Sequence, residues 1–254
     1  MTLKFASISA LAAALALVAP AAAPIAAQDL SNVESEFADK DRKKGWSTKV
    51  KRTERGHLIG NPDAETQLIE FVSYTCSHCA DFAKTGEPAL EVTAVSDGDI
   101  GFEVRPVIRN ALDLTVSLLA ACGSPEGFKG RHRDLMLSQS KWLDAAVKAP
   151  QSQKAVWFRG DKGGRINAAS ALDLDDQMVA RGLTRTEITA CLSDNVAAQK
   201  LLDNGQADAT EFGIQGTPSF AMDGKLLDRV HAWPTLYPVL AARIEEQRAR
   251  SGGE

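Results

Sequence analysis

The sequence has 254 residues and a formal net charge of −4 at pH 7, with 44% hydrophobic and 24% charged residues. These proportions are ordinary for a soluble globular protein, and such mild acidity gives no global reason to expect nucleic acid or an anionic membrane as a partner. The length suffices for one large domain or for one domain that carries a sizeable insertion.

The first 27 residues have the pattern of a secretory signal peptide. Lys4 is the only charge, an apolar run from Ala10 to Val18 follows, Pro20 breaks it, and small residues precede a cleavage site near Gln28. An uncleaved membrane anchor is the alternative, but the apolar core is shorter than the roughly 20 residues that span a bilayer. We therefore expect removal of residues 1–27 and a periplasmic protein.

Residues 28–55 are expected to form an N-terminal arm and a first strand. Eight lysines and arginines crowd between Lys40 and Arg55, and the imperfect alternation from Trp46 to Leu58 indicates a strand. Charged side chains on an edge strand discourage aggregation. We therefore interpret this basic cluster as a solvated edge and not as a binding patch.

The clearest element is a strand–helix–strand unit around the first two cysteines. Residues 66–73 are rich in branched and aromatic side chains, as in a short, buried parallel strand. A helical pattern then starts at residues 76–79, with a kink or break expected where Gly86 and Pro88 interrupt it. A second strand at 100–107 completes a right-handed parallel crossover.

Residues 112–202 lack convincing strands and are expected to form a helical insertion. The apolar spacing suits helices that pack on one another. The glycine-rich segment 159–164 is expected to be a loop. Several helices are indicated, among them Leu112–Cys122, Gly130–Gln139, Gln151–Phe158 and Thr184–Leu192.

The last part of the chain returns to sheet-like sequence. A helix over 196–212 precedes a strand at 216–222, and residues 223–224 are typical of a hairpin turn. The apolar spacing over 234–248 predicts an amphipathic helix. The tail 251–254 is expected to fray.

Four cysteines form an even set, Cys76, Cys79, Cys122 and Cys191. Disulfides are the default in an exported chain, and the two-residue spacing favours Cys76–Cys79 and Cys122–Cys191 among the three possible pairings. A structural Cys122–Cys191 bond would contribute about 4 kcal/mol on the chain-entropy model. Two buried free thiols or a second redox pair are the alternatives.

The chemistry of the first pair follows from its place at a helix start. Unpaired amide groups and the helix dipole stabilise an anion there, which lowers the pKa of Cys76 from about 8.5. Since the thiolate attacks disulfides, we expect Cys76 to be the attacking residue and Cys79 the resolving one. His78 can contact the Cys76 sulfur and lower its pKa further, unless it is only a solvent-exposed helix residue.

Metal binding is the competing interpretation of the cysteine pair. A zinc site needs two more ligands at suitable spacing, yet Cys122 and Cys191 are isolated and His57, His132 and His231 form no paired motif. No metal and no cofactor are therefore expected. Copper handling stays an alternative, because thiolates suit Cu(I).

Two motifs carry a family resemblance. The run 70–79 (EFVSYTCSHC), followed far downstream by 216–220 (GTPSF), resembles the DsbA-like thiol-disulfide oxidoreductases of the thioredoxin superfamily. The resemblance implies an α/β, thioredoxin-like fold with an inserted α-helical domain. Residues 56–111 and 203–250 would be its two halves, on either side of the insertion at 112–202.

The resemblance also implies roles for single residues. Pro218 would be a cis-proline that faces the cysteines, and Thr217 would offer backbone groups to an extended substrate peptide. Glu70 would lie buried beneath Cys79 and exchange protons with it. The alternatives are a trans turn at Pro218 and an outward-facing, solvated Glu70. Ser77 stands where strongly oxidising relatives carry proline, so the redox direction stays open.

The predicted function is that of an exported thiol-disulfide oxidoreductase that introduces disulfides through Cys76 and Cys79. Its partners would be reduced or misoxidised exported proteins and a membrane protein that reoxidises, or reduces, the site; nucleic acid is not expected. A disulfide isomerase or reductase is the first alternative, and residues 28–45 would then be a candidate dimerisation segment. A non-enzymatic copper carrier or peptide-binding protein is the second.

Overall fold

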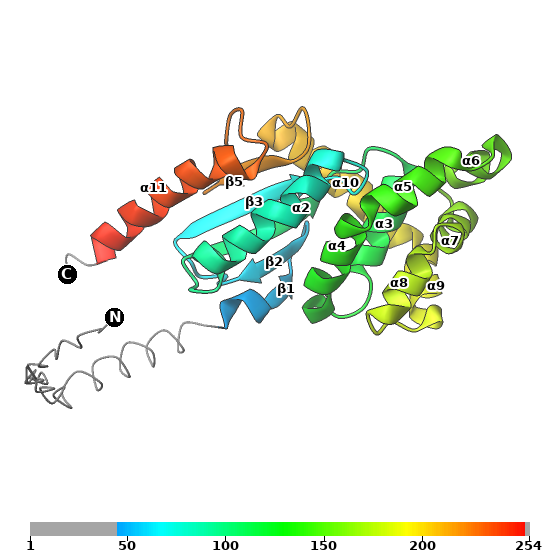
Figure 1. Ribbon diagram of the computed structural model, residues 1–254, viewed down its shortest axis with the longest axis horizontal. Coiled ribbons are helices and arrows are strands. Elements are labelled where there is room, and N and C mark those ends of the chain that lie inside the picture. The colour runs from blue at the N-terminus through cyan, green and yellow to red at the C-terminus, as the bar shows by residue number, and fades with distance from the viewer. Residues whose placement is uncertain (1–44, 252–254) are drawn as a thin grey trace, which may run out of the picture. The chain divides into compact units, whose positions relative to one another are not determined.

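The structure is a computed structural model that describes residues 45–251 (Figure 1). The predicted signal peptide, most of the predicted N-terminal arm and the last three residues lie outside the described residues. Within the described part, no helix is long and apolar enough to cross a membrane.

The centre of the fold is a mixed sheet of six strands in the order β1-β2-β4-β3-β5-β6. Only β3 and β4 run parallel, and every other neighbouring pair is antiparallel. The bounds are β1 Val50–Arg52, β2 His57–Gly60, β3 Thr66–Val72, β4 Ile100–Pro106, β5 Ser219–Met222 and β6 Lys225–Leu226. The predicted strand–helix–strand unit is thus confirmed as β3, α2 (Ser77–Leu90) and β4.

The first strand differs from the prediction. The single strand expected over 46–58 is a short 3-10 helix, η1 (Trp46–Thr48), followed by the β1–β2 hairpin. Thr53 closes the turn, because its Oγ1 accepts a hydrogen bond from the amide of Gly56 at 2.8 Å. Gly56 is required there, since a Cβ atom would lie 2.2 Å from the Val104 carbonyl oxygen. The turn lacks the Asn-Gly or Asp-Gly signal that marks a hairpin in sequence.

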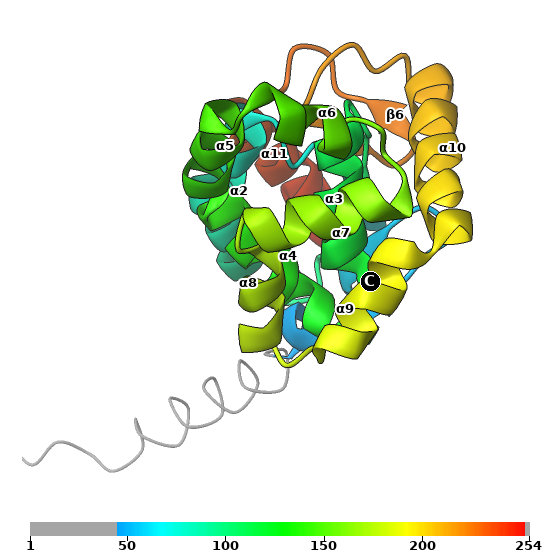
Figure 2. The same cartoon turned by 90° about the vertical axis from the view of Figure 1, so that its right-hand side faces the viewer.

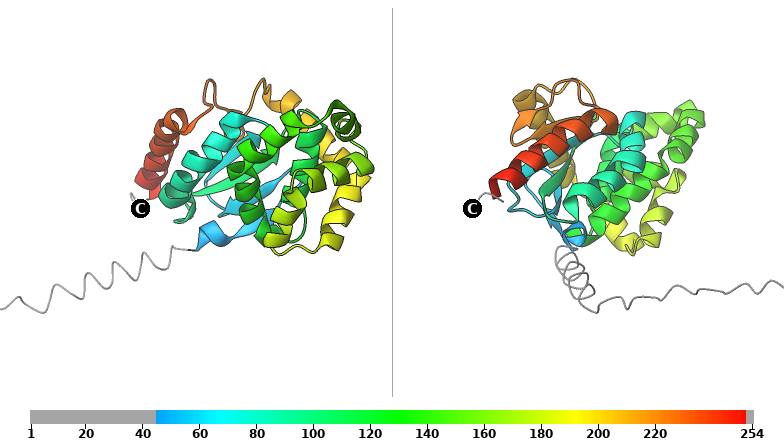
Figure 3. Two further views of the ribbon diagram at one scale, coloured as in Figure 1. Left: turned by 45° about the vertical axis from the view of Figure 1, so that its right-hand side comes forward. Right: turned by 60° about the vertical axis from the view of Figure 1, so that its left-hand side comes forward.

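The two faces of β3 pack against different helices. Leu68 and Val72 belong to the main core together with Phe82 of α2 (Ser77–Leu90). Ile69 and Phe71 point the other way, into a small cluster that includes Phe212 of α10 (Asn195–Phe212). Side chains alternate along a strand, so Glu70 faces the α2 side of the sheet. Figures 2 and 3 show α10 on one side of the sheet and α2 with α11 (Trp233–Ser251) on the other.

Helix α2 continues through Gly86 and Pro88, where a kink or break was expected. Pro88 lies inside it, and the chain continues into a π-helical turn, η2 (Glu91–Val95). Gly86 serves close packing, because a Cβ atom there would lie 2.4 Å from the Phe82 ring. The glycine therefore marks a contact within the helix and not its end.

The predicted helical insertion is confirmed: the chain between β4 and α10 is helical. It contains three helices that the sequence pattern did not indicate, namely α5, α7 and α8. Part of the expected loop 159–164 belongs to α7, because the Asp161 carboxylate caps this helix by accepting a hydrogen bond from the Gly164 amide at 2.7 Å. The bounds are α3 Ala111–Ala121, η3 Pro125–Gly127, α4 Phe128–Leu137, α5 Gln139–Lys148, α6 Gln151–Trp157, α7 Lys162–Ala171, α8 Leu174–Ala180 and α9 Arg185–Ser193.

Helix α10 returns the chain to the sheet. It starts at the cap Asp194 and ends at Gly213, whose positive φ of 67° stops the helix. The predicted boundary between residues 202 and 203 lies in the middle of this helix. The hairpin that follows turns at Asp223 and Gly224, which both have positive φ, as predicted for residues 223–224.

Candidate active site

The cysteine pair lies at the junction of β3 and α2, as its sequence predicted. Cys76 is the N-cap residue of α2, and its amide donates to the Ser73 carbonyl at 3.1 Å in the turn that leaves the strand. Both Cys76 and Cys79 are free thiols in the structure, with Cys76 6% exposed and Cys79 fully buried. Ser77 and His78 between them are exposed.

The two thiols have opposite acidities. Hydrogen bonding from the Cys79 thiol lowers the pKa of Cys76 to about 4, and Thr217 and the backbone amides of Cys79 and His78 act in the same direction against the effect of burial. Burial raises the pKa of Cys79 far above its usual value, and the neighbouring Cys76 and Glu70 add to this rise. At neutral pH the pair therefore consists of a thiolate at Cys76 and a fully buried thiol at Cys79.

The loop before β5 lies against Cys76. The Thr217–Pro218 bond is cis, and the Cys76 thiol donates to the Thr217 carbonyl oxygen at 3.0 Å. The Thr217 hydroxyl is buried and has no hydrogen-bond partner among residues 45–251. His231 was not predicted as part of this region, yet its Nδ1 lies 2.7 Å from the Pro218 carbonyl oxygen.

Glu70 is fully buried on the α2 side of β3. Neither of its carboxylate oxygens has a hydrogen-bond partner in the described part of the chain. Burial raises the pKa of this carboxyl well above its usual range, and the negative charges of Glu87 and Cys76 raise it further. An exposed, solvated Glu70 does not occur in the structure.

A groove of about 350 Å³ opens at Cys76. Arg109 is the charged residue of its wall, while Val107 and Ile214 are apolar, and none of the acidic side chains in residues 45–251 lines it. The remaining lining residues are His78, Gln215, Gly216 and Thr217. The groove thus joins the start of α2 to the cis-proline loop, where a peptide can reach the Cys76 sulfur.

The insertion adds two residues that sequence reasoning missed. Asp113 of α3 accepts hydrogen bonds from the Ser73 hydroxyl at 2.6 Å and from the Tyr74 amide at 2.8 Å. Gln139 of α5 donates to the carbonyl oxygens of Tyr74 and Cys76, each at 2.8 Å. In the sequence, Asp113 could be recognised only as an acidic residue in the first turn of a helix. Nothing in the sequence pointed to Gln139.

The other cysteine pair forms a disulfide within the insertion. Cys122 and Cys191 are joined by an S–S bond of 2.04 Å and enclose a sequence separation of 69 residues. Cys122 follows the last turn of α3, and Cys191 belongs to α9. The bond therefore ties the first helix of the insertion to its last.

Two histidines outside the motif, His57 and His132, are buried and contact other side chains of the core. His57 stacks on Phe128 with ring centroids 3.9 Å apart, and burial lowers its pKa to about 3. His132 is buried between Tyr74, whose hydroxyl lies 2.8 Å from Nδ1, and Glu87, whose carboxylate lies 2.7 Å from Nε2. No cluster of three possible metal ligands occurs among the described side chains.

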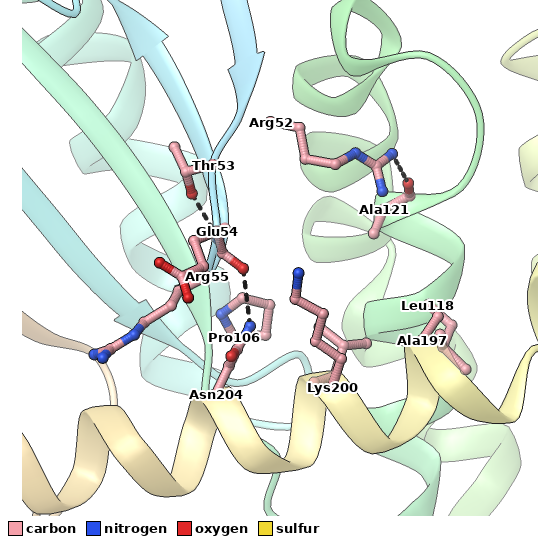
Figure 4. A pocket seen from close by; sticks show the side chains of 12 residues that line it. Arg52, Thr53, Glu54, Arg55, Pro106, Leu118, Ala121, Ala197, Lys200 and Asn204 are labelled. Atoms are coloured by element: carbon pink, nitrogen blue, oxygen red, sulfur yellow. Dashed lines mark hydrogen bonds between the residues drawn. The ribbon is translucent and has the colours of Figure 1, made fainter.

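A second pocket, of about 120 Å³, lies between the β1–β2 turn and α10 (Figure 4). The guanidinium of Arg52 donates to the Ala121 carbonyl at 2.7 Å, and Asn204 donates to the Glu54 carbonyl at 3.1 Å. Arg55, beside it, pairs with Asp208 and Glu211. Arg52 and Arg55 from the basic cluster thus join the hairpin to α3 and α10.

A family model described as Thioredoxin matches residues 52–240. The chain therefore belongs to the thioredoxin family, the class of protein that the sheet, the cysteine pair and the cis-proline loop define. Among solved structures it is similar to a protein-disulfide isomerase from Novosphingobium aromaticivorans, at 37% identity and a TM-score of 0.71, with 75% of this chain and 98% of that one covered.

Its fold is also that of DsbA proteins. The alpha-DsbA1 of Wolbachia pipientis is 17% identical, with a TM-score of 0.61 and coverage of 76% of this chain and 92% of that one. The DsbA-like resemblance and the thioredoxin-like fold with an inserted helical domain are thus confirmed.

Curated relatives come from Rickettsia. The protein of Rickettsia bellii named "Putative protein-disulfide oxidoreductase" is 27% identical over 76% of this chain. A relative from Rickettsia conorii is 26% identical over 78% of this chain. The chain spans 66% and 63% of the length of these two relatives, just under two thirds.

Proposed function

We propose that this protein is an exported thiol-disulfide oxidoreductase that introduces disulfides into proteins in the periplasm. The observation that carries the proposal is the opposite acidity of the pair, with a pKa of about 4 for Cys76 and a strongly raised pKa for Cys79. Such a pair offers a good leaving group at the groove and a buried thiol that keeps its proton.

The reaction starts from the oxidised pair. A substrate thiolate attacks the Cys76 sulfur, a mixed disulfide forms, and the Cys76–Cys79 bond breaks with Cys79 leaving as a thiolate that takes up one proton. A second substrate thiolate then attacks the substrate sulfur of the mixed disulfide, and Cys76 leaves as a stable thiolate. The substrate loses two electrons to the cysteine pair, and a membrane redox partner takes them when it reoxidises the site.

Glu70 is the proposed proton donor for Cys79. Its carboxyl is buried, and burial raises its pKa well above the usual range, which favours the protonated form that a proton donor needs. It lies on the face of β3 that packs against α2, the helix of Cys79, and in its ionised form it raises the pKa of that thiol. Proton transfer from Glu70 prevents a bare thiolate from forming in the apolar core.

Three residues at the groove are proposed to act on the substrate side. Thr217 places its carbonyl group beside Cys76, next to the cis-proline Pro218, where we propose that an extended peptide binds. The His78 side chain lines the same groove and adds a donor near the sulfur. The direction of transfer rests on the low pKa of Cys76, because stabilising the reduced form makes the disulfide a stronger oxidant.

An isomerase is the second candidate function. The relative with 37% identity is named a protein-disulfide isomerase, and the same two cysteines would serve that reaction. A reduction potential near −120 mV would mark an oxidant, one near −180 mV is that of protein disulfide isomerase, and one near −270 mV would indicate reductive work. Measuring it in a glutathione redox buffer separates the two functions.

Trapping the mixed disulfide tests the proposal itself. We expect Cys79→Ser to accumulate a mixed disulfide with an oxidised test protein, because the resolving thiol is gone. Cys76→Ser should abolish oxidation of a reduced test protein and trap nothing. If both variants oxidise the test protein at the rate of the parent protein, the pair is not the redox centre.

A further inference from the structure

The segment from Ser73 to Cys76, which carries the nucleophile, is held by side chains from the helical insertion. Gln139, the first residue of α5, is 4% exposed. Its amide nitrogen donates to two carbonyl oxygens of the segment, those of Tyr74 and Cys76, at 2.8 Å each. Figure 1 shows α5 beside the first turn of α2. Both amide hydrogens of Gln139 are thus used by the segment.

Asp113 holds the same segment from α3. Its carboxylate is fully buried and accepts from the Ser73 hydroxyl, the Tyr74 amide and, at 3.0 Å, the Arg109 amide. Its own amide donates to the Asn110 side chain at 2.9 Å, so the carboxylate is fixed at the start of α3. One side chain therefore connects the turn before Cys76 to Arg109 in the wall of the groove.

These contacts control the position of the sulfur through the backbone. The Cys76 carbonyl is the first acceptor of α2, since it receives the Ala80 amide at 3.2 Å as well as Gln139. The orientation of this peptide group fixes how Cys76 stands over the first amides of the helix. Those amides stabilise the thiolate only at hydrogen-bond distance.

Buried polar groups of this kind are costly in a helix that only covers a sheet. A buried amide or carboxylate loses water and must recover its hydrogen bonds inside the protein. Here the partners of Gln139 belong to the active-site segment, and those of Asp113 belong to this segment, to the groove wall and to its own helix start. An apolar contact would cover the core equally well but would not fix a backbone orientation.

We propose that Gln139 and Asp113 are positioning residues for thiol-disulfide exchange, which hold residues 73–76 so that the Cys76 sulfur stays over the helix amides and beside Thr217. The inference rests on the proposed function of the Cys76–Cys79 pair. It makes the helical insertion part of the reaction apparatus, although its side chains do not touch the reacting sulfur.

The test compares two variants of the same helix. Gln139→Met removes both donors to the segment and keeps a long, unbranched side chain. Trp142→Phe is the matched control, because Trp142 is also buried in α5 and its indole donates to the Leu135 carbonyl at 2.9 Å, away from the cysteines. Both variants lose buried hydrogen bonds and should melt at a lower temperature.

Only the Gln139 variant should change the chemistry. The pKa of Cys76, read from the pH dependence of its alkylation in the reduced protein, should rise by about 1 unit. Oxidation of a reduced test peptide should slow by roughly tenfold, since stabilisation of the leaving thiolate is lost. Trp142→Phe should leave both readouts at the parent values.

Substitutions at Asp113 and Ser73 form a second series of variants, with smaller expected changes in the pKa of Cys76. Asp113→Asn keeps one oxygen as an acceptor for the Tyr74 amide, whereas Asp113→Ala removes all acceptors, so Asn should retain more of the low Cys76 pKa than Ala. Ser73→Ala deletes one hydroxyl donor and keeps the backbone. If the Gln139 or Asp113 variants do not fold, the Cys76 pKa of Ser73→Ala still tests whether these contacts position the sulfur.

Two outcomes are separable. If Gln139→Met and Ser73→Ala both keep the parent pKa of Cys76 while the parent protein oxidises the peptide, the positioning roles are wrong and the proposed function stands. If the parent protein has a low Cys76 pKa but transfers no disulfide, the proposed function fails. In that case the Cys76 pKa of the variants, measured by alkylation with a small reagent, still tests the positioning roles of Gln139 and Asp113.

Discussion

The two cysteine pairs of this chain lie at opposite ends of helices. Cys76 caps the N-terminus of α2, where free amide groups and the positive end of the helix dipole stabilise a thiolate. Cys122 caps the C-terminus of α3, where the carbonyl end of the dipole disfavours a negative charge. We infer that the local backbone, and not the residue type, which is the same at both positions, makes Cys76 reactive and leaves Cys122 structural.

Removing the structural pair is expected to have the largest effect on stability. A Cys122→Ser and Cys191→Ser double variant should lose about 4 kcal/mol of unfolding free energy on the chain-entropy model. The pKa of Cys76 should not change, since neither sulfur acts on it. Urea unfolding measures the loss of unfolding free energy, and the pH dependence of alkylation measures the pKa of Cys76. A shifted Cys76 pKa would show that the two cysteine pairs are coupled.

Glu70→Gln is expected to slow exchange without removing the nucleophile. The amide fills the same buried space but cannot deliver a proton to Cys79, so oxidation of a test peptide should slow by about 100-fold, the low end for general acid catalysis. The control readout is the rate of Cys76 alkylation at neutral pH, which should stay near the parent value. An unchanged exchange rate would remove Glu70 from the mechanism.

The reduced protein is expected to gain stability as the pH rises. The folded pKa of Cys76 is about 4, far below the value of a free thiol in the unfolded chain. The unfolded state therefore binds more protons across this window, and the unfolding free energy should rise by up to about 1.4 kcal/mol per pH unit between the two pKa values. Below pH 4 this contribution is lost.

The oxidised protein supplies the control for this pH dependence. Its Cys76 does not titrate, so the difference in unfolding free energy between reduced and oxidised protein reports the thiolate together with its effect on Glu70, whose pKa the Cys76 charge raises. Asp113, whose pKa burial raises to about 6, acts with the opposite sign between its unfolded and folded pKa values. This effect cancels in the difference if it is equal in both forms. A flat difference across the window would contradict a low Cys76 pKa.

His78→Ala is expected to have the smallest effect. The side chain is exposed, and the contacts that lower the Cys76 pKa come first from Cys79, with Thr217 and backbone amides adding to them. We expect a rise of less than about 1 unit in the pKa of Cys76, measured by alkylation. A larger rise would make His78 the main tuning residue.

The sequence predicted those parts of the site that are local. Strand β3, the start of α2 and the hairpin at Asp223-Gly224 each depend on neighbouring residues, and the family resemblance added Pro218 from far along the chain. Asp113 and Gln139 were missed because their partners lie 39 to 65 residues away in the chain. Nothing in the sequence around them distinguishes such contacts from ordinary helix starts.

The most direct measurement is the pH dependence of Cys76 alkylation in the reduced protein, with Cys79 too buried to compete. A low Cys76 pKa predicts a midpoint near pH 4, so that the rate is already constant at neutral pH. A midpoint near the value of an ordinary thiol, about 8.5, would contradict an activated Cys76 and with it the proposed reaction.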